Sequence, residues 1–526
     1  MRYRPARAAL AIWNASHARS PSDRRYAGYL GVMVAIAFVA PAVRALWGAV
    51  SQPHVLHALV APEAPLVGGL CVAGLWVFAL LFGGLRGPAL RPPLLTYTFA
   101  RSELSRISAF GGSVVRAGAA LTATTAMVGA ALGTLLGVAR GVTLLDLFAV
   151  ASLGACIGAC VGVIATLAWL TGQAVPRVAR ASSAALAILT GITIAFPSLT
   201  PFTPWGWVAA LWREAALSAG ELSVGASWLV PLTLLCALAL VLMSIAPTLF
   251  ARLDTQVLES QAARWAASAV HAYGMDFNAA LSTYRGSPWA GRRVRAVRAG
   301  PRGRRGVALA RTFLIRDVLG AARTPGRLTG GAVGVAAASV AVTLASSATE
   351  PGFGFGVLSA LAAVLAFGAL GPFTDGVRHA AAVSADLPVY GVGDAHLLAL
   401  HTVFPALAVL MIGVIAASIS AFLLGAPPLA AVLGSAIVGM CAVLARVSNA
   451  LKGPLPLRLL APIPTPEGDL SGAVRFVWSI DGVVLVALVG ATAPLALIAP
   501  TWCIAACSLL AAVCAARWRG RRTVAG

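Results

Sequence analysis

Long runs of apolar residues, separated by short polar gaps, follow one another along the whole chain. The hydrocarbon core of a bilayer is about 30 Å thick and is crossed by roughly 20 helical residues. The pattern therefore predicts an all-α polytopic membrane protein with about 12 transmembrane helices. We expect these spans at residues 28–49, 65–85, 112–138, 145–172, 181–199, 226–250, 328–348, 354–372, 396–423, 428–446, 477–497 and 499–516.

Arginine is concentrated in alternate gaps between the predicted spans. The segment before the first span and the gaps after the second and sixth spans are rich in arginine, whereas SQPHVLHALVAPEAP and ATEPGFG contain none. Loops on the cytoplasmic side carry an excess of Lys and Arg. The alternation predicts an even number of spans with both termini in the cytoplasm. The preference for Arg over Lys, with abundant Ala and Gly, indicates a bacterial source and thus the inner (cytoplasmic) membrane.

A long polar stretch divides the spans six and six. We expect a first six-span unit at 1–250, a basic cytoplasmic linker that is partly disordered at 251–304, and a second six-span unit at 305–526. Each half opens with apolar residues and arginines at helical spacing, at 5–27 and 305–326. This spacing is typical of an amphipathic helix lying in the membrane interface. The shared order of elements predicts an internal duplication.

Charge and composition exclude several functions. Hydrophobic residues make up 59% of the chain and charged residues 11%, with a net charge of +22. A nucleic-acid-binding surface needs its basic groups on one solvated face, but here they lie in short loops between apolar helices. We therefore expect the lipid bilayer, and no nucleic acid, as a partner.

The sequence offers no site for catalysis. A P-loop needs a lysine that neutralises phosphates in GxxxxGK[ST], and the only lysine, Lys452, does not stand in such a motif. HExxH and GxSxG are also missing. We expect a protein that is not an enzyme and binds no cofactor itself.

Two sets of small residues recur at helical spacing. Glycines at every fourth position place a groove along one helix face and allow close backbone approach; they are Gly129, Gly133 and Gly137 in the third span and Gly154, Gly158 and Gly162 in the fourth. We expect tight packing between these spans; the alternative is an interface that slides between two states. All eight cysteines fall inside predicted spans, so no disulfide framework is indicated. The i, i+4 pairs Cys156/Cys160 and Cys503/Cys507 lack nearby His or carboxylate ligands, so we expect packing residues and no metal.

Ionisable groups inside the spans are scarce. Asp146, Asp481 and His401 lie near the ends of their spans, and Arg44 lies where its side chain can reach the interface. Buried charges at a span centre mark proton or ion pathways, so their scarcity weakens a proton-driven mechanism. Trp205, Trp207 and Trp212, between the fifth and sixth spans, suit an outer membrane interface.

The order of these elements resembles the membrane subunit of ATP-binding-cassette exporters of the type-2 class, with two six-span permease units fused in one chain. The two amphipathic entry helices match that family's connecting helices. Residues 87–110 and 371–395 match its coupling segments between the second and third spans. Residues 200–222 match its outer re-entrant helices in the first half, but the gap around Pro500 is too short to match them in the second.

The resemblance implies a separate cytoplasmic ATPase subunit, in two copies, that binds ATP and Mg and docks on the coupling segments. The implied contacts are Arg101, Glu103, Arg106, Asp375, Arg378 and Asp386. Rocking of the two units would then export a cargo. Because the spans offer no charged binding site, we expect a hydrophobic or amphipathic cargo.

Two other interpretations remain open. A proton- or ion-coupled secondary transporter of the major-facilitator kind also has twelve spans in two halves, and GPFTDGVRH after the eighth span is similar to that family's G-x-x-x-D loop motif. The first half, with GPALRPP, lacks the Asp. A membrane scaffold without transport activity is the third interpretation.

Overall fold

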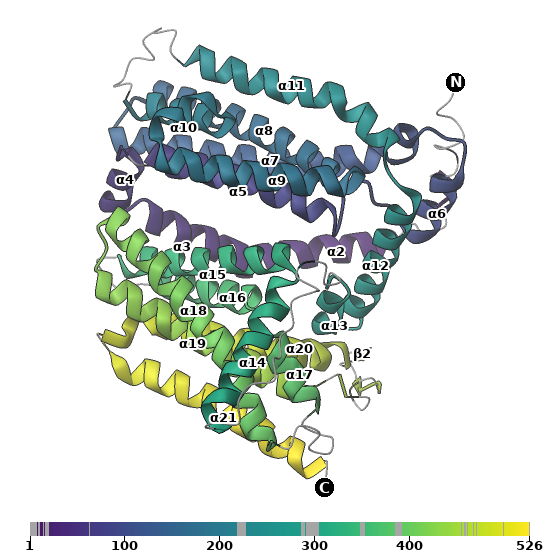
Figure 1. The fold of residues 1–526 in the computed structure, drawn as a ribbon, viewed down its shortest axis with the longest axis vertical. Coiled ribbons are helices and arrows are strands. Elements are labelled where there is room, and N and C mark those ends of the chain that lie inside the picture. The colour runs from purple at the N-terminus through teal and green to yellow at the C-terminus, as the bar shows by residue number, and fades with distance from the viewer. Residues whose placement is uncertain are drawn as a thin grey trace. The chain divides into compact units, whose positions relative to one another are not determined.

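Ten helices long and apolar enough to cross a membrane lie in the part of the chain that the structure describes, and they confirm an all-α polytopic membrane protein (Figure 1). The structure is a computed structural model. It describes residues 20–526, together with 8, 11–13 and 15, but leaves out 63, 218–227, 286–289, 291–304, 348–352, 384–391, 454, 457–458, 460, 466–467, 470, 498 and 525–526. The ten helices are α5 (Ala64–Gly83), α7 (Arg106–Arg140), α8 (Leu144–Ala174), α9 (Pro176–Ala195), α11 (Leu229–Ala251), α15 (Pro325–Ser346), α18 (Asp394–Leu424), α19 (Pro428–Lys452), α20 (Ser471–Thr492) and α21 (Pro500–Val524).

The two other predicted spans form shorter helices. The first is divided by a π-helix, so that α2 (Pro21–Val34), η1 (Ala35–Val39) and α3 (Ala40–Val50) follow one another without a break. The eighth forms α16 (Phe353–Ala369), which is 17 residues long. Apolar composition thus located both helices, but it did not reveal the π-helix.

Short elements join the long helices. In the first half these are α4 (Pro53–Val60), α6 (Pro93–Arg101), the 3₁₀ helix η2 (Pro197–Phe202) and α10 (Pro204–Leu217). The predicted linker begins with α12 (Thr255–Tyr273) and α13 (Phe277–Ser282). The second half adds α14 (Arg305–Ala322), α17 (Asp375–Val383), the two-residue strands β1 (Pro464–Thr465) and β2 (Gly468–Asp469), and the 3₁₀ helix η4 (Ala493–Leu497).

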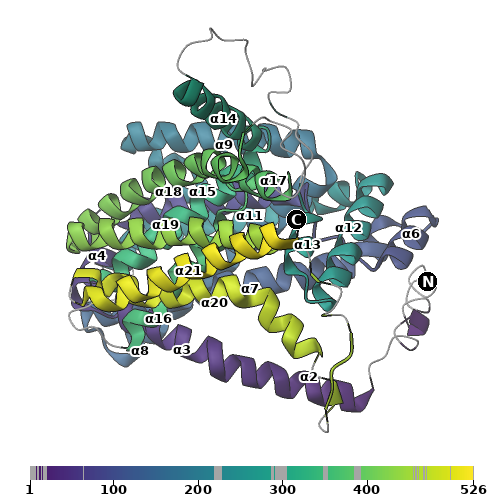
Figure 2. The ribbon, with the colours of Figure 1, turned by 90° about the horizontal axis from the view of Figure 1, so that it is seen from below.

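Two compact units are defined by their internal contacts. The first contains residues 1–30, 53–270 and 279–284, and the second contains 31–52, 271–278 and 285–526. The predicted division placed residues 31–52 with the first half, but α3 packs against α16 in the second unit (Figure 2). Hydrophobicity predicts that a segment spans the membrane, but it does not determine which bundle the segment joins.

The same helix pairs are in contact in both units. In the first unit α8 packs against α5, α7 and α11, and α5 also packs against α9. In the second unit α19 packs against α16, α18 and α21, and α16 also packs against α20. Helix α7 in the first unit and helix α18 in the second unit correspond to each other. Each ends at a glycine in the left-handed region, Gly141 or Gly425, with φ of 62°. Left-handed glycine caps reverse the chain tightly, so each half contains the same long helical hairpin.

Glycine lets α7 and α8 approach at backbone distance. A Cβ atom on Gly129 would lie 2.1 Å from the carbonyl oxygen of Gly154, and one on Gly158 would lie 2.2 Å from that of Thr125. The structure places Gly133, Gly137, Gly154 and Gly162 on the same seam, where an added Cβ would lie 2.2–2.5 Å from an atom of the facing helix. Backbone atoms of the facing helix therefore exclude a larger residue at these positions except Gly137, where the close atom is Cδ1 of the flexible Leu147 side chain.

Of the tryptophans between α9 and α11, Trp205 is buried, whereas Trp207 and Trp212 are half-buried. Trp205 is 0% exposed and packs in the core of the first unit with Leu211 and Leu235. Trp212 donates from Nε1 to the carbonyl of Leu59 at 3.0 Å. Residues 197–217 fold as η2 and α10, and α10 packs against α5 and α11. The second half has only η4 in the corresponding place.

Candidate functional site

The segment after α5 carries a short amphipathic helix, α6, in the first predicted coupling region. Leu95, Phe99 and Ala100 are buried, whereas Leu94 and Tyr97 on its other face are 59% and 50% exposed. Large apolar groups on an exposed helix face are typical of a binding surface when they occur together. The helix therefore has one face that anchors it to its own unit and one that is available for contact.

Two buried glutamines hold the segment that leads from α5 into α6. Gln173, near the end of α8, accepts from the backbone N–H of Ala89 at 3.0 Å, and Gln261 of α12 accepts from that of Gly87 at 3.0 Å. Gln261 also donates to the carbonyl of Gly83 at 3.0 Å. The two amides meet directly, Gln173 Nε2 donating to Gln261 Oε1 at 2.9 Å. Three chain segments distant in sequence are thus joined by buried hydrogen bonds, which we call the glutamine clamp.

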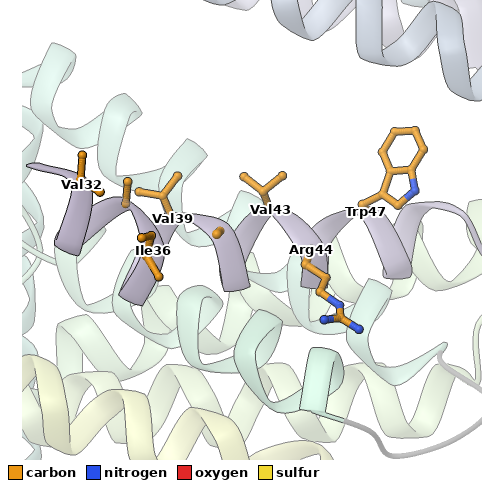
Figure 3. Close-up of a pocket in the computed structure, with 8 residues that line it drawn as sticks. Val32, Ile36, Val39, Val43, Arg44 and Trp47 are labelled. Carbon is orange, nitrogen blue, oxygen red and sulfur yellow. The ribbon is translucent and has the colours of Figure 1, made fainter.

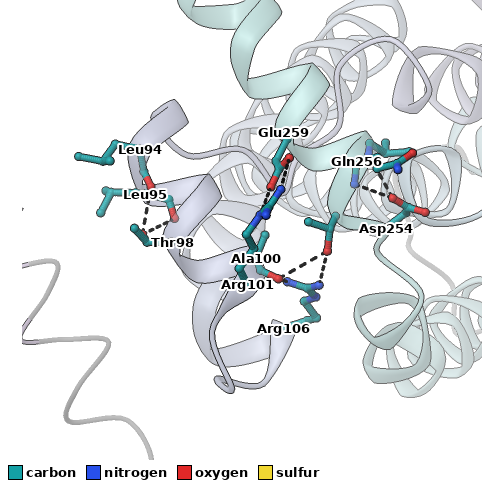
Figure 4. Close-up of polar contacts among 11 residues, drawn as sticks. Leu94, Leu95, Thr98, Ala100, Arg101, Arg106, Asp254, Gln256 and Glu259 are labelled. Carbon is teal, nitrogen blue, oxygen red and sulfur yellow. Dashed lines mark hydrogen bonds and ion pairs between the residues drawn. The ribbon is translucent and has the colours of Figure 1, made fainter.

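An ion pair and polar contacts join α6 and the start of α7 to α12 (Figure 4). Arg101 Nε lies 3.0 Å from Glu259 Oε1, and the Arg101 guanidinium stacks over the ring of Tyr97 at 4.3 Å. The hydrogen bond and charge of Glu259 raise the pKa of Arg101. Arg106 donates to the carbonyl of Ala100 at 2.7 Å and to Thr255 Oγ1 at 2.8 Å. Both predicted contact arginines are therefore engaged within their own unit.

Glu103 differs from its two arginine neighbours because it lies exposed in the turn between α6 and α7. Sequence reasoning grouped Arg101, Glu103 and Arg106 as equivalent contacts. The structure brings all three to one end of the bundle, but it leaves Glu103 as the carboxylate that faces solvent. The partner of Arg101, Glu259, was missed because it lies in the predicted linker, 158 residues away.

Arg91 is a buried cation that fixes the start of α6. Its Nε donates to the carbonyl of Ala109 at 2.6 Å, and its guanidinium lies 5.4 Å from the centre of the Phe99 ring. Burial lowers the pKa of Arg91, and the charge of Arg116 lowers it further. The arginine ties the loop before α6 to the beginning of α7.

The second predicted coupling region contains α17, which has the same length as α6 but other contacts. Asp375 Oδ2 lies 3.0 Å from Arg327 Nη1 and Asp375 Oδ1 lies 3.6 Å from Arg378 Nη1. Burial is the main cause that lowers the pKa of Arg378, and the charge of Arg285 adds to it while Asp375 opposes it. Asp375 and Arg378 therefore belong to an ion-pair cluster within the second unit. Asp386 lies outside the described residues.

Arg446 of α19 binds the end of α16. Its Nε donates to the carbonyl of Phe367 at 2.6 Å and its Nη2 to that of Gly368 at 3.0 Å, with the guanidinium 4.1 Å from the centre of the Phe367 ring. Carbonyl groups at a helix C-terminus lack intrahelical partners, and a guanidinium can satisfy two of them at once. Arg446 and Gln173 lie near the ends of corresponding helices. Arg446 binds the last turn of its half's second span, and Gln173 binds the segment just after the second span of the other half.

A histidine and an aspartate form the most deeply buried titratable pair among the described residues. His401 Nδ1 of α18 lies 2.7 Å from Asp317 Oδ2 of α14, with the side chains 0% and 8% exposed. A Cβ on Gly376 of α17 would lie 2.5 Å from His401 Nδ1, so the pair is covered by the backbone of α17. The sequence places His401 near the end of its predicted span and gives no indication of its pairing with Asp317.

Asp481, which the sequence also places near the end of its predicted span, is engaged in a second polar cluster. Lys452 Nζ lies 2.9 Å from Asp481 Oδ1, and Arg517 pairs with Asp481 Oδ2. Arg517 also donates to Ser448 Oγ at 2.8 Å. This cluster joins α19, α20 and α21 at one end of the second unit.

An apolar stripe runs along α2, η1 and α3 (Figure 3). Val32, Val39, Val43 and Trp47 form this stripe and are 45–60% exposed, while Ala45 is buried. They line a shallow groove together with Ile36, which Figure 3 shows directed to the other side of the helix. Arg44 also lines the groove, and Figure 3 shows its guanidinium directed away from Trp47. The stripe offers contact to an acyl chain or another apolar group but no polar binding group besides Arg44.

Each unit contains one pair of cysteines that lie close together on two neighbouring helices, and the helices of the two pairs correspond. Cys160 of α8 faces Cys236 of α11 with a distance of 3.6 Å between the sulfur atoms, and Cys441 of α19 faces Cys507 of α21 at 3.6 Å. The described residues contain no group of three or more His, Cys, Asp or Glu side chains arranged to hold a metal ion. The spacing within each helix predicted neither of these pairs.

Comparisons with protein-family models, with curated proteins and with solved structures found no match to this chain.

Proposed function

We propose that the chain is the membrane-spanning permease subunit of an ATP-driven exporter, energised by a separate ATPase subunit. The observation that carries this proposal is the recurrence of one arrangement in both halves: a nine-residue helix, α6 or α17, follows the second long helix and is held by polar side chains from neighbouring helices. Such a segment can transmit displacement to the spans because it is not free to move alone.

The proposed partner binds ATP and Mg and docks on these segments from the cytoplasm, in two copies, with both termini of the permease on that side of a bacterial inner membrane. Exposed Leu94, Tyr97 and Glu103 are the strongest contact candidates in the first half. Arg101, Arg106 and Asp375 hold the segments in place, since each has a partner on another helix of its own unit. Arg378 pairs with Asp375 within α17. The permease itself catalyses no reaction.

We propose a hydrophobic or amphipathic cargo. The apolar stripe on α2 to α3 supports this choice, because its exposed groups are aliphatic or aromatic with one flanking arginine. Amphipathic molecules combine an apolar body with a polar end, and such a stripe can accommodate both.

A reconstitution experiment tests the proposal. The permease is co-expressed with the ATPase subunit encoded beside it and purified, and ATP hydrolysis is measured in proteoliposomes with and without the permease. We expect the permease to stimulate hydrolysis, and Glu103→Gln to abolish stimulation while Asp146→Asn, at the other end of the α7–α8 hairpin, leaves it intact. Transport without any ATPase, driven by a proton gradient, would instead support the major-facilitator interpretation. The buried Asp317–His401 pair favours that alternative, because buried ionisable pairs occur in proton relays.

A further inference from the structure

The Asp317–His401 pair joins three elements that have different predicted roles. Asp317 lies on the entry helix α14, His401 on the long helix α18, and Gly376 of α17 covers both side chains. Figure 2 shows these three helices. Phe313 of α14 packs its ring edge-to-face with His401, with 4.9 Å between ring centres. Any change in the pair therefore acts on the contact of α14 with both α18 and α17.

The hydrogen-bond geometry shows what the histidine can still bind. At 2.7 Å, Nδ1–H donates to the carboxylate of Asp317, which leaves Nε2 as the second nitrogen of the ring. Nε2 is buried and has no hydrogen-bond partner among the described residues. With a neutral imidazole, the pair carries one net negative charge in a site from which water is excluded. A buried charge without full compensation is unfavourable.

The charged and titratable groups around the pair are few. From α14 comes Arg316 and from α17 comes His379, whose ring centre lies 6.4 Å from that of His401. Helices α15 and α19 also pack against α18. Their arginines have other partners, because Arg327 of α15 is paired with Asp375 and Arg446 of α19 binds the end of α16. On α18 itself, His396 is exposed five residues before His401.

We propose that Nε2 of His401 is a proton-binding site whose occupancy sets how firmly α14 is held against α18 and α17. One proton taken from water converts the imidazole to imidazolium and brings the net charge of the pair to zero. The existing Nδ1–H···Oδ2 bond, until then a neutral ring donating to a carboxylate, then joins two opposite full charges that attract each other. Acidic pH tightens the contact, and alkaline pH loosens it.

His379 is placed to support this change. Burial lowers the pKa of His379, and the charges of Arg316 and His401 lower it further, with Asp317 acting in the opposite direction. A neutral His379 does not repel the imidazolium of His401. The inference goes beyond the proposed function, because the contact would respond to protons whether ATP or an ion gradient drives transport.

Amide hydrogen exchange of the full chain in lipid nanodiscs tests the proposal. Exchange of residues 305–322 is measured at pH about 5.5 and about 8, on either side of the ordinary histidine range, and corrected for the intrinsic pH dependence of exchange. We expect about tenfold slower exchange at the acidic pH, because an ion pair of imidazolium and carboxylate then replaces a bond from a neutral ring. Helix α9, which contains no histidine, serves as the internal reference.

Variants identify the group responsible. His401→Gln and Asp317→Asn should abolish the difference in α14, and His396→Gln should retain it. His379→Gln tests whether the neighbouring histidine causes the effect. In this variant, exchange of α14 should still be slower at the acidic pH. Should His401→Gln not fold, the wild-type measurement alone decides, because equal corrected exchange at both pH values overturns the proposal. A difference that persists in His401→Gln overturns it as well.

Discussion

Gln173 and Gln261, 88 residues apart in sequence, form a hydrogen bond of 2.9 Å at positions that are 0% and 1% exposed. Each amide also satisfies a backbone group of the segment between α5 and α6. A Cβ on Gly87 would lie 1.9 Å from Gln173 Cδ, so the backbone passes directly over the amide. The clamp therefore fixes the position of α6 through the backbone and does not depend on the side chains of α6.

Replacing Gln261 with Ala should weaken the fold of the first unit. The substitution leaves the N–H of Gly87 and the carbonyl of Gly83 without their side-chain partner. Unsatisfied buried groups cost about 1–3 kcal/mol each, so we expect the free energy of unfolding to fall by about 2–4 kcal/mol, measured by denaturation with SDS in mixed micelles. Gln256→Ala is the control because Gln256 is exposed on the same helix. Equal effects of the two substitutions would contradict the clamp.

Gly158→Ala should force α7 and α8 apart. The new methyl group would lie 2.2 Å from the carbonyl oxygen of Thr125, a backbone atom that cannot move without the helix. Overpacking of this kind costs about 1–3 kcal/mol. The matched control is Gly74→Ala in α5, where the Cβ has open space and the substitution should be neutral or stabilising by about 0.4–1 kcal/mol. We compare the thermal unfolding midpoints of the two variants in the same detergent. The midpoint of Gly158→Ala should be the lower of the two.

His379 should make the second unit less stable in acid. Since its pKa in the folded protein is lowered from 6.5, mainly by burial, the unfolded chain binds the proton more readily. Its contribution to stability is fully present above pH 6.5 and is lost as the pH falls through the lowered value. We expect His379→Gln to lose less stability than the wild type between pH about 7 and about 5, measured as the unfolding midpoint at each pH. Parallel pH profiles for the two proteins would show that this assignment is wrong.

The spans were predictable from the sequence, whereas the polar contacts between them were not. Apolar runs of sufficient length have few alternatives to a membrane helix, and so α7, α8, α18 and α19 lie where composition placed them. Glutamine has no comparable signature. Gln173 and Gln261 stand in ordinary helical sequence, and only the folded chain brings them to the same segment.

Asp317 shows how an amphipathic pattern can mislead. The arginines of α14 predict a polar face toward water and headgroups, and an aspartate beside Arg316 would be expected to share it. In the structure Ile315 and Val318 are exposed, and Asp317 faces His401 in the interior. An outward apolar face suits a helix in contact with lipid, so the acidic group is directed toward the protein, where a histidine from a distant helix is its partner.

The cysteine pairs provide a test of the helix arrangement in both units. Mercuric ion replaces the protons of two thiols and forms a neutral bis-thiolate, Hg²⁺ + 2 RSH → Hg(SR)₂ + 2 H⁺, which an apolar site tolerates. In a background where the other cysteines are Ser, Cys160 with Cys236 should bind one mercury per chain, and so should Cys441 with Cys507, since each pair has its sulfur atoms 3.6 Å apart. Both thiols of a pair should then be protected together from alkylation, as read by mass spectrometry.

A chain that retains only Cys71 and Cys160 is the control and should show no joint protection, because Cys71 is exposed on α5. Joint protection in the control, or its absence in both pairs, would contradict the placement of α11 against α8 and of α21 against α19.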